Sequence, residues 1–202
     1  MSTSLDPGQS LELDGDHVRL ESMSLAHLPG LVACGLDPGI WTWMPLTVSD
    51  EAGMRAVVEA ALAGRDAGTE FPFVTVDRGT GQVVGSSRYL ALALAHRRLE
   101  IGWTWITPSA QRSAVNTETK LLMLSYAFKT LGCLRVEFKT DARNAASRAA
   151  LLGIGATFEG VFRKHMVVRD GERRDSAWYS ITDDEWPAVQ VHLRQRLSRH
   201  RP

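Results

Sequence analysis

The sequence has little of what marks several special classes of protein. It holds only two cysteines, Cys34 and Cys133, whose spacing fits no metal or redox motif. Its 23 Lys and Arg residues balance 23 Asp and Glu residues, so no net field favours nucleic acid or an anionic membrane. No stretch approaches the roughly 18 apolar residues that a membrane-spanning helix needs. We therefore expect a cytoplasmic protein that binds no metal, no nucleic acid and no membrane.

What remains is the composition of an ordinary globular protein. Hydrophobic residues make up 44% of the 202 residues and charged residues 23%. A chain of this length buries enough surface for a core of its own, so we expect a single domain over residues 11–202. Residues 1–10 lack the basic start and apolar run of a signal peptide, and we expect them to form a flexible leader.

Hydrophobic periodicity and turn residues divide the chain into helices and strands. Apolar spacings of three and four, behind capping residues, predict helices over 24–34, 49–64, 117–131, 144–153 and from 182 onward. Alternating or apolar runs between turns predict strands over 11–13, 17–21, 71–76, 83–94, 97–106, 134–139, 156–162, 164–168 and 175–181. This order predicts an α+β fold with a mixed sheet.

The polar segment 107–116 stands out because it joins an aromatic-rich strand to the most strongly periodic helix. The first four N–H groups of a helix have no partner within the helix, and the helix dipole adds partial positive charge there. Phosphate groups bind at such places. The segment therefore predicts an anion site where the strand turns into the helix.

Three segments around this junction carry a resemblance to a known family. They are Leu99-Glu-Ile-Gly-Trp before the turn, Asn116-Thr-Glu-Thr-Lys after it, and Asn144-Ala-Ala-Ser-Arg with the following residues up to Gly155-Ala156. Between the first two, Gln111-Arg-Ser-Ala-Val-Asn resembles the Gln/Arg-x-x-Gly-x-Gly/Ala pyrophosphate loop of the GNAT superfamily of acyl-CoA-dependent N-acyltransferases. The match, over about residues 15–185, is most similar to the branch of RimJ- and RimL-type ribosomal-protein acetyltransferases.

The resemblance implies a fold and a place for acyl-CoA. It implies a mixed, mostly antiparallel sheet of six to seven strands, flanked by helices, in which the strand at 103–106 splays from the one at 136–139. The pantetheine would lie in that gap and pair with the backbone of Trp103, Trp105 and Ile106. The diphosphate and the opposite wall would involve Gln111, Arg112, Ser113, Ala114, Val115, Asn116, Thr117, Asn144 and Arg148. We also expect a homodimer.

The loop departs from the family pattern at two positions. Ala114 stands where glycine is usual, and Asn116 stands where glycine or alanine is usual. Alanine restricts a backbone conformation with positive φ, whereas asparagine tolerates it better and can donate a hydrogen bond. We expect CoA to bind, in a slightly different pose.

The chemistry needs a base, an oxyanion donor and a proton for the leaving thiolate. Glu100, before the splay, is the candidate base; the alternative is an edge-strand glutamate that faces solvent. The backbone N–H of Trp105 or Ile106 is the candidate oxyanion donor. Ser147 takes the position at which the family often has tyrosine, and we expect it to relay a proton through water. Its alternative is a serine that only begins a helix.

The acceptor side is less well defined by the sequence. The branch places a carboxylate on a late strand, and none is apparent near His165, which is itself either a substitute base or structural. Trp41 and Trp43 are candidates to wall the acceptor groove, or else anchor their loop in the core. We expect Arg88 and Tyr89 to face the same groove, with Arg88 pairing a carboxylate of the acceptor or of the acyl group.

The leading hypothesis is an N-acyltransferase that moves acetyl from acetyl-CoA directly to a primary amine. The amine belongs to a protein N-terminus, a peptide or a small molecule. Succinyl-CoA or another acyl-CoA is an alternative donor. A CoA-binding module without catalysis and an oligomeric interaction protein with a vestigial loop stay open as alternatives from other classes.

Overall fold

A computed structural model describes residues 5, 6, 8 and 10–199 of the chain. Residues 1–4, 7, 9 and 200–202, which include most of the expected leader, lie outside this description.

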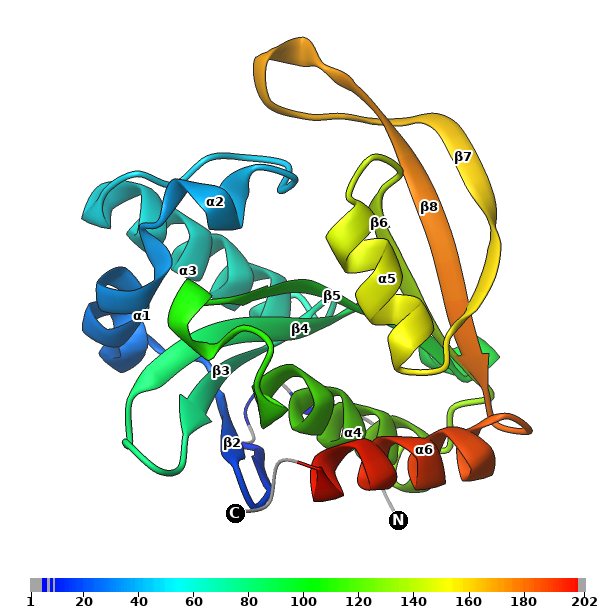
Figure 1. Cartoon of the computed structure of the whole chain (residues 1–202). Coiled ribbons are helices and arrows are strands. Elements are labelled where there is room, and N and C mark those ends of the chain that lie inside the picture. Colours follow the sequence, from blue (N-terminus) through cyan, green and yellow to red (C-terminus); the bar gives the residue numbers. More distant parts are fainter. Residues whose placement is uncertain (1–4, 7, 9, 200–202) are drawn as a thin grey trace.

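Within the described residues, eight strands form one continuous sheet in the order β1-β2-β3-β4-β5-β6-β8-β7 (Figure 1). Every neighbouring pair is antiparallel except β5 with β6. The strands are β1 (Glu12–Asp14), β2 (Val18–Ser22), β3 (Phe71–Asp77), β4 (Val83–Ala93), β5 (Arg98–Ile106), β6 (Arg135–Asp141), β7 (Thr157–Val167) and β8 (Arg173–Thr182). The α+β class and the mostly antiparallel sheet are confirmed. The strand count exceeds the expected six to seven because the N-terminal hairpin joins the sheet through β2 and β3.

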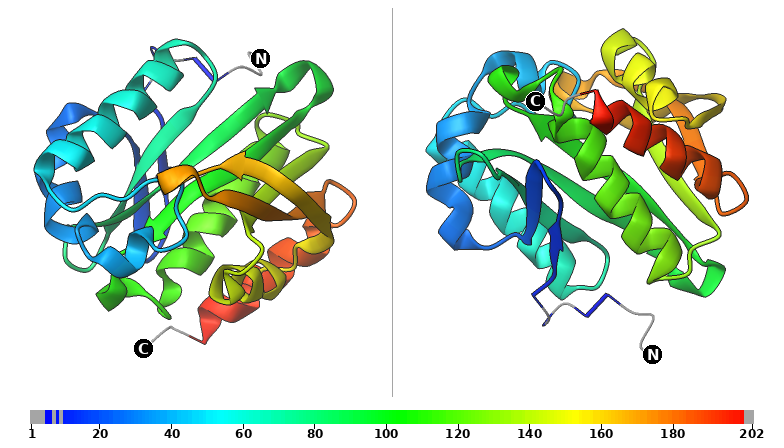
Figure 2. Two further views of the ribbon diagram at one scale, coloured as in Figure 1. Left: turned by 90° about the horizontal axis from the view of Figure 1, so that it is seen from above. Right: turned by 60° about the horizontal axis from the view of Figure 1, so that its bottom comes forward.

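Helices cover both faces of the sheet (Figures 1 and 2). The helices are α1 (Leu28–Gly35), α2 (Pro38–Trp41), α3 (Glu51–Asp66), α4 (Ala114–Lys129), α5 (Ala145–Gly153) and α6 (Trp186–Ser198). One core cluster packs α4, α5 and α6 against one face, with Met123, Leu151 and Leu193 among its members. A second cluster packs α1 and α3 on the other face of β3 to β5, through residues such as Leu31 and Met54.

Two element boundaries differ from the sequence prediction for identifiable reasons. The helix expected from residue 117 begins at Ala114, because the Ser113 side chain accepts a hydrogen bond from the Val115 N–H and caps it there. The strands expected over 156–162 and 164–168 form the single strand β7. An irregularity between Phe162 and Met166, with Lys164 at φ +51°, separates its two halves without ending it.

The centre of the sheet opens where β5 and β6 meet. Only Arg98, Leu99 and Glu100 of β5 pair with β6, opposite Arg135, Val136 and Glu137. Both strands continue beyond this point without pairing to each other. The splay expected between 103–106 and 136–139 is therefore present.

Candidate active site

A bulge shapes β5 beyond the point of divergence. The pairing of β4 with β5 shifts register between Ser86 and Arg88, which face Trp105 and Gly102. Trp103 takes up the extra residue with φ +49°, a backbone conformation rarely adopted by a bulky side chain. Because β6 has already diverged, the backbone of β5 beyond Glu100 has an edge without a partner strand. An extended chain of amides can pair with such an edge.

The turn after β5 ends at the N-terminus of the 16-residue helix α4. Ser113 Oγ accepts from the Val115 N–H and donates to the Ala110 carbonyl oxygen at 2.6 Å, which fixes the turn. The helix geometry pairs the Thr117 N–H with the Ser113 carbonyl. The N–H groups of Ser113, Ala114 and Asn116 are left at the positive end of the helix dipole, where an anion is stabilised.

The left-handed residue of this loop is not the one that the sequence indicated. Arg112 has φ +60°, whereas Ala114 and Asn116 have helical φ values inside α4. The expected cost of alanine in place of glycine at position 114 is therefore absent. Arg112 carries that conformational cost, and its exposed side chain has no ion-pair partner among the described residues. Gln111 donates its side-chain N–H to the Ile106 carbonyl oxygen at 3.1 Å and so ties the turn to the end of β5.

Glu100 lies at the last paired position of β5 and is 2% exposed. Its Oε2 accepts from Lys139 Nζ on β6 at 2.8 Å. Burial raises the pKa of Glu100, and the ammonium of Lys139 opposes that rise. Gly102 leaves room for the carboxylate, because a Cβ there would meet Glu100 Oε1 at 2.7 Å. The alternative of a glutamate facing solvent is thus wrong, since this carboxylate is enclosed at the splay.

Residues of α5 stand at the end of β6, across the splay from β5. The Asn144 side chain caps α5 by accepting from the Ser147 N–H at 3.0 Å. Arg148 donates to Tyr179 Oη at 3.0 Å and to the Ala142 carbonyl oxygen, which holds its guanidinium on the wall of β8. Ser147 is half-buried, and its hydroxyl makes no hydrogen bond to another described residue.

Three of the four expected acceptor-side residues turn out to belong to the interior. Trp41 is 1% exposed, packs against Trp105 and donates its indole N–H to the Gly35 carbonyl, so it anchors its loop. Tyr89 is fully buried on the α4 face and donates to the Met123 carbonyl oxygen at 2.7 Å. These two residues do not face a groove. Arg88 is also buried, and Glu70 neutralises it at 3.0 Å.

Trp43 belongs to a contact between the two halves of the molecule. The Arg143 guanidinium stacks 5.1 Å from the centre of the Trp43 ring. Arg169, at the tip of the β7–β8 hairpin, donates its side chain to the carbonyl oxygens of Thr42 and Met44 and its backbone N–H to Pro45. Figure 2 shows this tip beside the loop that follows α2. We name these contacts the strap.

Two polar arrangements escaped the sequence analysis. Lys120 of α4 is 4% exposed and donates to Thr104 Oγ1 at 2.7 Å, and Thr104 is hydrogen-bonded to Ser87. Burial lowers the pKa of Lys120 to about 7. The second arrangement is the ion pair of Lys139 with Glu100. Helix periodicity carried the signal for the first, because it places Lys120 on the apolar side of its helix. The second depends on the pairing of β5 with β6, which periodicity within a single strand does not give.

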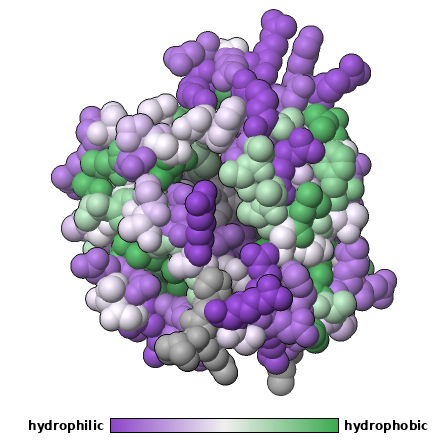
Figure 3. Space-filling model, in the orientation of Figure 1, coloured by the Kyte–Doolittle hydropathy of each residue, from purple (hydrophilic) through white to green (hydrophobic). Residues whose placement is uncertain are grey.

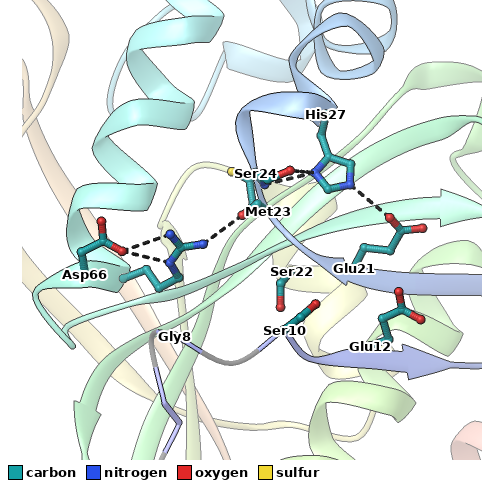
Figure 4. A pocket seen from close by; sticks show the side chains of 10 residues that line it. Gly8, Ser10, Glu12, Glu21, Ser22, Met23, Ser24, His27 and Asp66 are labelled. Atoms are coloured by element: carbon teal, nitrogen blue, oxygen red, sulfur yellow. Dashed lines mark hydrogen bonds and ion pairs between the residues drawn. The ribbon is translucent and has the colours of Figure 1, made fainter.

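Hollows of different kinds lie on the surface of the described residues. Figure 3 shows a recess between the half of the molecule with α1 to α3 and the half with α5, β7 and β8. A hollow of about 690 Å³ lies along β7 and is lined by Phe162, Arg163, Lys164 and His165. Another hollow, of about 620 Å³, lies beside the N-terminal hairpin (Figure 4). There His27 contacts Glu21 and Arg65 contacts Asp66, so its charges are largely paired internally, and it contains none of the expected site residues.

A sheet that opens beside the N-terminus of a buried helix is the arrangement expected of proteins that bind acyl-CoA. Comparison with known proteins agrees. The family described as "Acetyltransferase (GNAT) domain" matches residues 17–157, and the chain belongs to this family. No helix within the described residues is long and apolar enough to cross a membrane.

Individual relatives support this assignment. The chain is 36% identical over 104 residues to the uncharacterized N-acetyltransferase YoaA of Bacillus subtilis (strain 168), a match over 52% of this chain and 58% of YoaA. A GCN5-related N-acetyltransferase from Brucella melitensis superposes with a TM-score of 0.87 at 30% identity, covering 95% of this chain and 87% of that one. RimJ of Mycobacterium smegmatis, solved with CoA-disulfide, shares the fold with a TM-score of 0.78 at 22% identity, over 94% and 95% of the two chains. The expected membership of the GNAT superfamily is confirmed.

Proposed function

We propose that the protein is an N-acyltransferase that moves an acetyl group from acetyl-CoA directly to a primary amine, within one domain over residues 11–202. The observation that carries the proposal is the loss of pairing between β5 and β6 after Glu100, directly beside the start of α4. The thioester lies between the strands, and the diphosphate lies against the free N–H groups of Ser113, Ala114 and Asn116.

The transfer is a single displacement. Glu100, as a carboxylate, takes the proton of the ammonium directly or through one water, and the free amine attacks the thioester carbon. The raised pKa of Glu100 makes it a stronger base than an exposed glutamate. The N–H of Trp105 or Ile106 stabilises the oxyanion as the C–S bond breaks. Ser147 relays to the leaving thiolate, through water, the proton that the nitrogen loses after its attack. The transfer takes place in the ternary complex, with no covalent enzyme intermediate.

Release of free thiol from acetyl-CoA, measured over a panel of peptides and small amines, tests the proposal. Wild-type protein is expected to release thiol only when an amine is present. E100Q is expected to lower kcat by about 10²- to 10⁴-fold, the usual contribution of a general base, with little change in the KM for acetyl-CoA.

E137Q is the matched control, because Glu137 is also buried, lies on the neighbouring strand and is paired with Arg98 and Arg135. Its activity is expected to stay near that of the wild type. CoA binding without thiol release for any amine would contradict transfer and support a non-catalytic CoA-binding module.

A further inference from the structure

Arg174 of β8 is a buried cation without a partner. The residue is 6% exposed, and its Nε is buried without a hydrogen bond. No described residue forms a hydrogen bond or an ion pair with the guanidinium. Removing a charge from water costs several kcal/mol unless a partner replaces the lost hydration. An arginine kept in this state indicates a partner that is not part of the folded chain.

The nearby carboxylates are already committed to other cations. Arg174 is within electrostatic reach of Glu100 and Asp141. Glu100 accepts from Lys139, and Asp141 accepts twice from the Arg143 side chain, at 2.9 and 2.8 Å. Neither carboxylate turns an oxygen to Arg174 at hydrogen-bond distance. The charge of Arg174 is therefore offset only by the longer-range attraction of these two carboxylates, without a direct hydrogen bond.

Other groups on the same face sense this positive charge. Met166 of β7 pairs with Arg174, and His165 beside it is hydrogen-bonded to Ser176, two residues along β8. Burial, Lys139 and Arg174 together lower the pKa of His165. The same histidine lines the hollow of about 690 Å³ along β7. Lys139 and Arg174 lie close enough to His165 for their charges to lower its pKa, and this concentration of positive charge favours an anionic group over a second amine.

We propose that Arg174 binds a carboxylate of the substrate, so that this transferase acts on a substrate pair in which either the amine acceptor or the acyl group carries a carboxylate. This inference rests on the proposed transferase function. A guanidinium matches a carboxylate through two parallel hydrogen bonds. A doubly charged phosphate fits less well, because Glu100 and Asp141 stand close by and repel it.

The position of Arg174 relative to Glu100 defines the class of substrate further. The charges of Arg174 and Glu100 interact, so the two side chains lie near each other. In the proposed mechanism Glu100 receives the proton of the amine. The carboxylate and the reacting centre are therefore close together. A short amino acid as acceptor, or a short dicarboxylic acyl group such as succinyl as donor, satisfies this requirement.

Matched substrate pairs separate these two sources. The acceptor arm compares amino acids with their carboxamides, using acetyl-CoA. The donor arm compares succinyl-CoA with acetyl-CoA, using an uncharged primary amine. In one arm the carboxylate substrate is expected to give kcat/KM about 10- to 100-fold above its neutral partner, the usual range for a hydrogen bond to a charged group. R174M is expected to remove that preference, so that kcat/KM becomes the same for the carboxylate substrate and for its neutral partner.

R173M is the control, since Arg173 precedes Arg174 on β8 and is exposed. It is expected to keep the preference. R174K, which retains the charge without the planar fork, is expected to give an intermediate preference and guards against a folding defect in R174M. Equal kcat/KM for the carboxylate substrate and its neutral counterpart in both arms would overturn the inference. The proposed transferase function would stand. Absence of transfer with every pair would instead overturn the proposed function, and the inference with it.

Discussion

At the scale of single residues, the proposed chemistry depends on how burial changes the pKa of Glu100. Glu100 is enclosed and held by Lys139, so its basicity reflects two opposed effects: desolvation raises its pKa and the ammonium lowers it. Removing Lys139 takes away the larger of the two cations that oppose desolvation.

K139M is therefore expected to raise the pKa of Glu100 further. The proposed base must be ionised to act, so the acid limb of the kcat/KM profile is expected to move to higher pH. Relative to wild type, K139M is expected to lose more activity at pH 6 than at pH 8. R98M is the control, because Arg98 pairs with Glu137 rather than Glu100. An unchanged acid limb in K139M, in a protein that still turns over, would separate Glu100 from the proton transfer.

At the scale of elements, α4 combines a buried lysine with a loop that begins the helix. The pKa of Lys120 is lowered from 10.5 to about 7 by burial, so the unfolded chain binds one more proton than the folded chain between these values. The free energy of unfolding therefore rises with pH in this window, by at most about 1.4 kcal/mol per pH unit. The contribution of Lys120 is least favourable below pH 7.

K120M is expected to flatten this dependence. Urea unfolding at pH 7 and pH 9 measures it: the advantage of K120M over wild type is expected at pH 7 and is expected to shrink at pH 9. Comparing the two proteins cancels the contributions of other titrating groups. K129M, at an exposed position of the same helix, is expected to follow the wild type. A pH dependence equal in K120M and wild type would place the amine in contact with water.

The left-handed loop residue offers a test with opposite effects on stability and binding. R112G is expected to raise the free energy of unfolding by about 0.5–1 kcal/mol, since glycine adopts φ +60° without strain. The same change removes a cation beside the start of α4 and is expected to raise the KM for acyl-CoA several-fold. Thermal melting and saturation kinetics measure the two effects. A lower KM for acyl-CoA in R112G would contradict a contact between Arg112 and the diphosphate.

Sequence patterns identified most elements and failed at particular side chains. The periodicity of α4 and the meander of β3 to β5 were predictable because each buries one stripe or face. The expectation that Arg88 and Tyr89 face the same groove was wrong, because adjacent residues of a strand point to opposite faces of the sheet. The free guanidinium of Arg174 was invisible too, since only the pairing of distant strands decides which carboxylates are already occupied.

At the scale of the whole molecule, the strap joins the loop after α2 to the β7–β8 hairpin. R169M removes its two side-chain hydrogen bonds. We expect a larger rise in the KM for the amine, several-fold, than in the KM for acyl-CoA, because the strap lies away from the start of α4. R173M on the same hairpin serves as control. Equal changes in both constants would contradict a role in holding the acceptor. Cytoplasmic location and a homodimer stay predictions.

Amide hydrogen exchange with and without saturating CoA tests the central arrangement most directly. The account predicts slower exchange in two segments, the part of β5 beyond Glu100 and residues 112–116 at the start of α4, with little change in β1 to β3. Protection confined to other segments, at a CoA concentration that raises the melting temperature, would contradict a thioester held between β5 and β6.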